Sequence, residues 1–163
     1  MWTLEMLSDS PSLLPAVKEL VREYVVLPDA WANPDGPPKC LPTFFVDEIT
    51  ALPSPAQLPD GDIAVAIEEG RAFGTALLVP FASSRAELKR LYVQPDMRAH
   101  EFGREIIGAL IGVAKELGCR SVVLDVMPSR KTAISLYRNV GFNPAPAFRH
   151  YESHEMLFFE LVL

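Results

Sequence analysis

The residues with the clearest chemical potential lie in one segment, 91–104, where a strand-like run leads into a basic loop and then into a helical pattern. Arg98, His100 and Arg104 give this segment its positive charge. Free N–H groups and a partial positive charge at the start of a helix attract phosphate. The segment therefore indicates a phosphate site. An ordinary strand–loop–helix turn with solvated charges would have the same spacing, so that interpretation also stays open here.

Glycine spacing narrows the kind of phosphate site that the chain could form. The sequence contains neither the Gly-x-Gly-x-x-Gly fingerprint of dinucleotide-binding folds nor a lysine-containing P-loop.

A second chemical candidate is the pair His150 and His154, with Glu152 and Glu155 beside them. On a helix this spacing could hold zinc. The pair lies between a proline-rich turn and the final strand, however, so we expect a loop without a metal.

Composition sets the class of protein. The chain has 163 residues, of which 49% are hydrophobic and 22% charged, as expected for one folded domain with a full core. A net charge of -6 argues against broad contact with nucleic acid. No apolar run is long enough to span a membrane. Two cysteines, Cys40 and Cys119, do not form a disulfide framework, so we expect a reducing, cytoplasmic setting.

Apolar periodicity predicts the elements that must position the basic loop. The expected strands are 2–7, 63–67, 73–78, 86–93, 121–126 and 156–163. The expected helices run from Ser10-Pro11 to about 24, over 44–52, over 102–117, and from Ser129 to 139, with proline-rich loops over 28–42 and 53–61. Residues 86–126 then form a β-α-β crossover with a parallel pair of strands. The fold class is α+β or α/β with a mixed sheet.

Three stretches resemble the GNAT acetyltransferase family. Leu91, Val93, Pro95, Arg98 and Gly103 match its acetyl-CoA loop, but Glu101 stands where the family has a glycine. The stretch 133–142 resembles the family's Ala-x-x-Leu-Tyr-x-x-x-Gly-Phe signature. The stretch 86–93 is similar to a subgroup of bacterial GNAT domains, some of them fused to transcription-regulator domains. The likeness covers roughly 47–163 well and the first helix only loosely.

This resemblance implies a fold and an activity. The fold would be a GNAT-like mixed, mostly antiparallel central sheet with a parallel β-α-β crossover and helices on both faces, in a single domain over 1–163. The activity would be direct transfer of an acetyl group from acetyl-CoA, as cosubstrate, to an amine of a small molecule. No metal, nucleic acid or membrane partner is implied, and a homodimer is possible because dimers are common in the family.

The resemblance also implies which residues hold acetyl-CoA. The backbone of Leu91, Tyr92 and Val93 would pair with the pantetheine arm, and the Val93 N–H would face the acetyl oxygen. The N–H groups of the basic loop would cradle the pyrophosphate, in a set made of Arg98, Ala99, His100, Glu101, Phe102, Gly103 and Arg104. Arg130 stands where many relatives have an asparagine that contacts the coenzyme.

Two residues are implied for proton transfer. Tyr137 matches the tyrosine that commonly protonates the leaving thiolate, and its alternative is a core aromatic on the buried side of its helix. Glu87 is the candidate general base, acting through a water, and its alternative is a surface carboxylate paired with Lys89. Asp47 and Asp125 are weaker candidates for the base.

Two other functions compete with the small-molecule enzyme. Glu101 in the phosphate loop would suit a catalytically weak acyl-CoA-binding module that senses or regulates. Acetylation of protein or peptide amines would need an open groove. The proline-rich loop over 28–42 and the loop over 148–154 would instead enclose an acceptor pocket.

Overall fold

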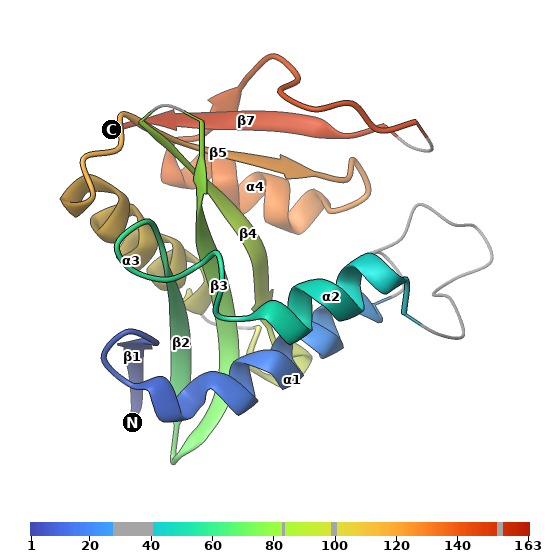
Figure 1. The fold of residues 1–163 in the computed structure, drawn as a ribbon. Coiled ribbons are helices and arrows are strands. Elements are labelled where there is room, and N and C mark those ends of the chain that lie inside the picture. Colours follow the sequence, from blue (N-terminus) through green and yellow to red (C-terminus); the bar gives the residue numbers. More distant parts are fainter. Residues whose placement is uncertain (28–40, 83, 99–100, 153–154) are drawn as a thin grey trace.

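The computed structural model describes residues 1–27, 41–82, 84–98, 101–152 and 155–163. Seven strands form one twisted sheet in the order β1-β2-β3-β4-β5-β7-β6 (Figure 1). The strands are β1 Trp2–Met6, β2 Asp62–Glu68, β3 Arg71–Phe81, β4 Arg85–Val93, β5 Ser121–Val126, β6 Asn143–Pro144 and β7 Leu157–Val162. The helices are α1 Leu14–Val25, α2 Thr43–Ala51, α3 Phe102–Glu116 and α4 Lys131–Val140, with short 3₁₀ turns at Pro11–Leu13 and Pro95–Met97.

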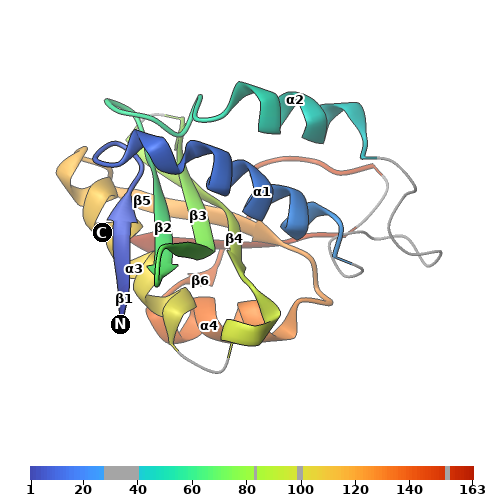
Figure 2. The same ribbon diagram turned by 90° about the horizontal axis from the view of Figure 1, so that it is seen from below.

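Helices cover both faces of the sheet. Figure 2 shows α1 and α2 on one face and α3 and α4 on the other. Each helix pair covers its own apolar core. On the α3 side the core includes Ile106, Ile107 and Leu110, and on the α1 side it includes Val17 and Val21. These are the residues that recur at helical spacing in the sequence, so the amphipathic pattern predicted the buried faces correctly.

The one parallel pair described in the sheet is β4–β5, joined through α3. Its ladder has only three residue pairs, in which Arg85–Glu87 of β4 lie opposite Ser121–Val123 of β5. Beyond this point the two strands separate (Figure 1). The β3–β4 register shifts between Thr75 and Leu77, which produces a β-bulge in β4. Arg90 lies in this bulge and has a positive φ of 54°. Bulges re-aim a strand, and this one lies where β4 no longer pairs with β5.

The predicted fold class is confirmed, including the mixed sheet, the β-α-β crossover and the helices on both faces. The predicted start of the first helical segment at Ser10-Pro11 is confirmed, as a 3₁₀ turn that leads into α1, but the Ser10 side chain does not cap it. The predicted start of α4 was wrong, because the helix begins at Lys131 with Arg130 rather than Ser129 at its N-cap. The strand β6 was not predicted, because two residues that include a proline carry no alternating pattern. Most of the 28–42 loop lies outside the described residues.

Candidate coenzyme and active site

A cavity of about 500 Å³ lies between the end of β4, the start of α3 and the start of α4. Its lining residues are Leu27, Leu91, Tyr92, Val93, Arg98, Glu101, Gly103, Arg104, Ser129, Arg130, Lys131, Thr132, Ala133, Leu136 and Asn139. Two helix N-termini and several cations therefore face one space. Such an arrangement suits an anionic ligand, above all a phosphate ester.

Most residues predicted for coenzyme binding meet in this cavity. Eight of them line it: Leu91, Tyr92, Val93, Arg98, Glu101, Gly103, Arg104 and Arg130. Phe102 does not line it, because its side chain is buried against the rings of Trp2 and Phe73, with centroids 4.9 and 4.8 Å away. The prediction for Phe102 therefore concerns only its backbone N–H. Ala99 and His100 lie outside the described residues. Sequence reasoning missed Lys131 and Asn139.

Glu101 occupies its family-glycine position without backbone strain. Its φ of -77° and ψ of 20° are open to any residue, so the left-handed freedom of glycine is not needed there. Its exposed carboxylate faces the exposed guanidinium of Arg104, with Oε2 and Nη1 3.8 Å apart. The side chain thus has a cationic neighbour on its own helix.

Gly103 lies at a close approach between two helices. A Cβ added to it would lie 3.0 Å from Cδ2 of Leu136, a cavity-lining residue of α4. This distance is tighter than ordinary van der Waals contact, so any larger side chain would push against α4. The small size of Gly103 thus serves helix packing beside the cavity as well as access to the backbone.

Arginines border both ends of the strand segment that lines the cavity. Nε of Arg98 donates a hydrogen bond of 2.9 Å to the carbonyl oxygen of Val93, and its guanidinium lies 5.7 Å from the ring centroid of Tyr92. The Tyr92 hydroxyl donates a hydrogen bond to Glu23. Burial, and to a smaller extent this hydrogen bond, raises the pKa of Tyr92 to about 12. The guanidinium of Arg130 lies 4.6 Å from the ring centroid of Tyr24.

Tyr137 is a core residue that does not line the cavity. It is 8% exposed and meets the ring of Phe142 edge-on at 5.9 Å between centroids, while the preceding residue, Leu136, lines the cavity. Burial raises the pKa of Tyr137 far above its ordinary value. The hydroxyl therefore keeps its proton at neutral pH, as a proton donor must. A core position and a donor role are compatible in this geometry.

Glu87 is not the surface carboxylate that one interpretation expected. It is 3% exposed, and its partner is Arg149 rather than Lys89. Nη1 of Arg149 donates a 2.8 Å hydrogen bond to Oε1 of Glu87, and Nη2 donates a 2.8 Å hydrogen bond to Oε2. A buried carboxylate needs such a partner because water no longer solvates it.

Asp125 belongs to the same group of side chains. Its Oδ2 accepts a 3.1 Å bond from Nη1 of Arg149 and a 2.6 Å bond from the Tyr151 hydroxyl. Burial opposes the charge of Arg149, but its bonds to Glu87 and Tyr151 and the nearby carboxylates outweigh that effect and raise the pKa of Arg149. Arg149 and Tyr151 were not predicted as partners of these carboxylates, because their loop lies far along the chain from β4.

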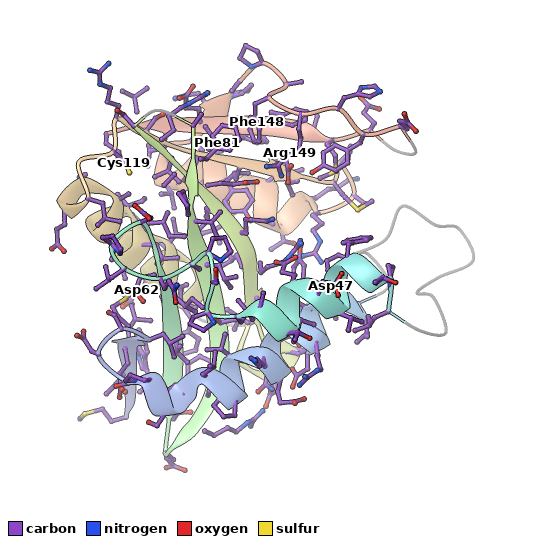
Figure 3. All side chains as sticks on the ribbon, viewed as in Figure 1. Asp47, Asp62, Phe81, Cys119, Phe148 and Arg149 are labelled. Atoms are coloured by element: carbon purple, nitrogen blue, oxygen red, sulfur yellow. The ribbon has the colours of Figure 1, made fainter. Side chains whose placement is uncertain are left out.

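Asp47 is exposed on α2, and Figure 3 shows it well away from Arg149. Its neighbour Glu48 instead pairs with Arg90 at the bulge, through bonds of 3.0 and 2.6 Å. Burial alone would raise the pKa of Glu48, but the hydrogen bonds and charge of Arg90, helped by Lys89, lower it overall. This pair fastens α2 to β4.

Other predicted features have simpler outcomes. His154 lies outside the described residues, and within the described ones no group of three or more His, Cys, Asp or Glu is placed to hold a metal ion. Cys119 is a free cysteine, and burial raises its pKa, while Cys40 is not described. None of the described helices has the length and apolar character needed to cross a membrane.

Comparisons with known proteins agree with this geometry. Residues 25–142 match the model of the acetyltransferase (GNAT) family. An uncharacterized N-acetyltransferase of Schizosaccharomyces pombe is 34% identical over 56% of this chain and 58% of its own length. An IAA acetyltransferase of Azospirillum brasilense is 30% identical over 57% and 61%. The ribosomal protein bS18-alanine N-acetyltransferase of Escherichia coli is 35% identical over 40% and 45%. The matches span less than two thirds of each relative.

Solved structures share the fold. An acetyltransferase from Streptococcus agalactiae superposes with a TM-score of 0.77 at 18% identity, covering 99% of this chain and 98% of its own. At such low identity the likeness concerns the arrangement of the strands and helices alone.

Proposed function

Because this chain belongs to the GNAT acetyltransferase family, we propose that it transfers an acetyl group from acetyl-CoA directly to an amine of a small molecule. The observation that carries this proposal is the cavity at the end of β4, with the N-termini of α3 and α4 facing it. Arg98, Arg104 and Arg130 supply positive charge for the phosphates of the coenzyme. The residues present therefore fit acetyl-CoA, which supplies the acetyl thioester when bound.

The backbone of β4 is suited to the pantetheine arm. Beyond Glu87 the β4 edge that faced β5 no longer has a strand partner, since the ladder stops at the Glu87–Val123 pair. Backbone groups of Leu91 and Val93 there could bond the amides of an extended ligand as another strand would. The Val93 carbonyl already accepts from Arg98, so we assign the ligand contact at Val93 to its N–H.

The reaction needs one proton removed and one supplied. The acceptor amine must lose a proton to become nucleophilic, and the departing sulfur must gain one. We assign the first role to Glu87, acting through a water, because it is a carboxylate held at the point where β4 and β5 part. We assign the second to Tyr137, whose hydroxyl stays protonated and which follows the cavity-lining Leu136 in α4.

The acceptor is the open part of the proposal. One relative is named for IAA and another for the alanine of a ribosomal protein, so the family's members span small and protein acceptors. A loop of this chain carries Phe148, Arg149 and Tyr151 across β4 and β5. That cover favours a small amine over a peptide, which would need an open groove.

Release of coenzyme A against a panel of amines tests the proposal. The panel should hold polyamines, amino acids, aminoglycosides and short peptides, with calorimetric titration of acetyl-CoA alongside. We expect binding of acetyl-CoA and turnover with at least one small amine. Turnover confined to peptides would transfer the assignment to protein acetylation. Binding with no turnover would favour an acyl-CoA-binding module, and no binding at all would refute the coenzyme site.

A further inference from the structure

The guanidinium of Arg149 joins two strands that are separating. Its bonds reach Glu87 of β4 at 2.8 Å and Asp125 of β5 at 3.1 Å. Glu87 is the last β4 residue in the parallel ladder, and Asp125 lies two residues beyond the last paired residue of β5. Arg149 therefore bridges the opening at its narrow end, from a loop between β6 and β7.

This bridge lies on the α1–α2 side of the sheet. Glu87 is opposite Val79 in the β3–β4 register, and Val79 belongs to the core under α1 and α2. Ala86 and Leu88, the neighbours of Glu87, belong to the core on the other side. The coenzyme cavity is lined by α3 and α4, so the two carboxylates approach the opening from the opposite side.

Packing fixes the position of the guanidinium. Its carbon lies 5.3 Å from the ring centroid of Phe148 and 6.0 Å from that of Phe81, and Figure 3 shows the three residues together above β4 and β5. The rings of Phe81 and Phe148 also pack on each other, with centroids 4.9 Å apart, so the planar fork lies against a paired aromatic surface that keeps both oxygens of a carboxylate in place. Phe148 also meets Phe158 of β7, with centroids 4.9 Å apart, which ties the loop to the sheet.

Burial makes Glu87 dependent on this cation. The Glu87 side chain is 4% exposed, whereas that of Asp125 is 15% and that of Arg149 is 31% exposed. The titratable groups that bond Arg149 in the described structure are Glu87, Asp125 and Tyr151. A carboxylate buried without its counter-ion takes up a proton at higher pH, because the neutral form needs less solvation.

We propose that Arg149 is a positioning residue that keeps the Glu87 carboxylate ionised and fixes its direction at the acceptor side of the strand opening. The inference rests on the proposed role of Glu87 as general base. It concerns ionisation, however, and ionisation can be measured without turnover.

The test compares Arg149→Gln and Arg149→Lys with Arg22→Gln, a control on the exposed side of α1, where Arg22 pairs with Glu19. The acid limb of the kcat/KM profile should move up by about 1–3 pH units in Arg149→Gln, the range over which an adjacent cation displaces a carboxyl titration. At pH values below the moved limb, kcat/KM then falls about tenfold for each pH unit, and it recovers at higher pH. The affinity for acetyl-CoA should not change.

Rescue separates this role from a purely structural one. Arg149→Lys keeps the charge but loses the two-point contact, so the acid limb of its kcat/KM profile should move less than that of Arg149→Gln. Added methylguanidine should partly restore Arg149→Gln and leave Arg22→Gln unaffected. If Arg149→Gln does not fold, the Arg149→Lys profile decides. An acid limb unmoved in every folded Arg149 variant, together with an unmoved carboxyl titration of Glu87, overturns the inference.

Carboxyl NMR of glutamate-labelled protein distinguishes the two proposals. If the Glu87 titration moves in the Arg149 variants while Glu87→Gln retains full turnover, the base assignment fails and the role of Arg149 in ionisation stands. If the Glu87 titration is the same in the Arg149 variants and the wild type, the inference fails, whatever the activity of Glu87→Gln.

Discussion

Tyr137 lies in the core, next in sequence to the cavity-lining Leu136, and only its hydroxyl distinguishes a packing role from a catalytic one. Tyr137→Phe keeps the ring contact with Phe142 and removes the proton donor. We expect turnover to fall by about 10²–10⁴-fold, the usual effect of losing a general acid. Steady-state kinetics on a working amine measures this. Acetyl-CoA affinity and the unfolding temperature should stay close to wild type, and a rate within about twofold would leave Tyr137 with packing alone.

Glu101 tests how much one carboxylate matters in a phosphate loop. It lines the cavity, but its exposed side chain already faces Arg104 at 3.8 Å. Solvent and salt screen exposed charges, so Glu101→Gly should tighten acetyl-CoA binding by about tenfold or less, and only at low salt. Calorimetry at two ionic strengths measures the effect.

Two glutamine variants separate charge from backbone at this position. Glu101→Gln should reproduce most of the gain of Glu101→Gly, since the backbone there needs no glycine. Glu105→Gln removes a carboxylate from the same first turn of α3 at a residue that does not line the cavity, and should change little. Equal effects from both glutamine variants would show a general field rather than a local repulsion.

Residues close together in sequence were the predictable ones. The positions from Leu91 to Arg104 that line the cavity follow one another along the strand, loop and helix, so their convergence is local. Glu87 and Arg149 are 62 positions apart, and their pairing depends on how the β6–β7 loop crosses the sheet. A strand pattern could not indicate that Glu87 is buried, since alternation alone does not say which charged residues find partners.

At the scale of elements, Gly103 sets the distance between α3 and α4 beside the cavity. Gly103→Val would push its side chain against Leu136 and bring bulk to the cavity wall, so acetyl-CoA affinity should fall by at least about tenfold. Gly108→Val is the matched control, because a Cβ at Gly108 meets nothing within 4 Å and the helix-propensity cost is the same. Calorimetry on both folded variants compares them. Similar affinities in the two would remove Gly103 from the site.

Elements were predictable where burial repeats with the period of the helix or strand. The extents of β5 and α3 follow from continuous apolar residues and from a helical stripe, respectively. Helix starts were less predictable, because Ser10 uses its hydroxyl on Glu5 and does not cap the following turn. The side chain had a competing partner that lies in another element, and no local rule contains that information.

At the scale of the whole molecule, the Glu48–Arg90 pair joins the α2 layer to the sheet. The pKa of Glu48 is lowered in the folded protein, so its contribution to stability is present above the unfolded-state value of about 4.3 and is lost as the pH falls through the folded-state value. Glu48→Gln should therefore reduce stability at pH 7 and flatten its decline in acid. Urea unfolding between pH 3 and 7 measures this. A parallel decline in both proteins would contradict it.

The overall topology could be predicted because the crossover over 86–126 admits few arrangements of strands. Family likeness then implied a mostly antiparallel sheet with helices on both faces, which apolar patterns do not contain. What neither source gave is the side-chain network on the α1–α2 side of the opening. It consists of two separate groups, Arg149 and Tyr151 with the carboxylates of β4 and β5, and Arg90 with Glu48, and each joins elements distant in the chain.

The short β4–β5 ladder has a mechanical consequence. Seven residue pairs join β2 to β3 and six join β5 to β7, but only three join β4 to β5. The sheet therefore consists of two extensively paired parts, β1–β4 and β5–β7, which are joined in its middle by one short ladder (Figure 1). A ligand bonded along the free edge of β4 would extend the hydrogen bonding between these two parts. They would then move together, so the same backbone groups that bind the ligand would also set the stiffness of the sheet.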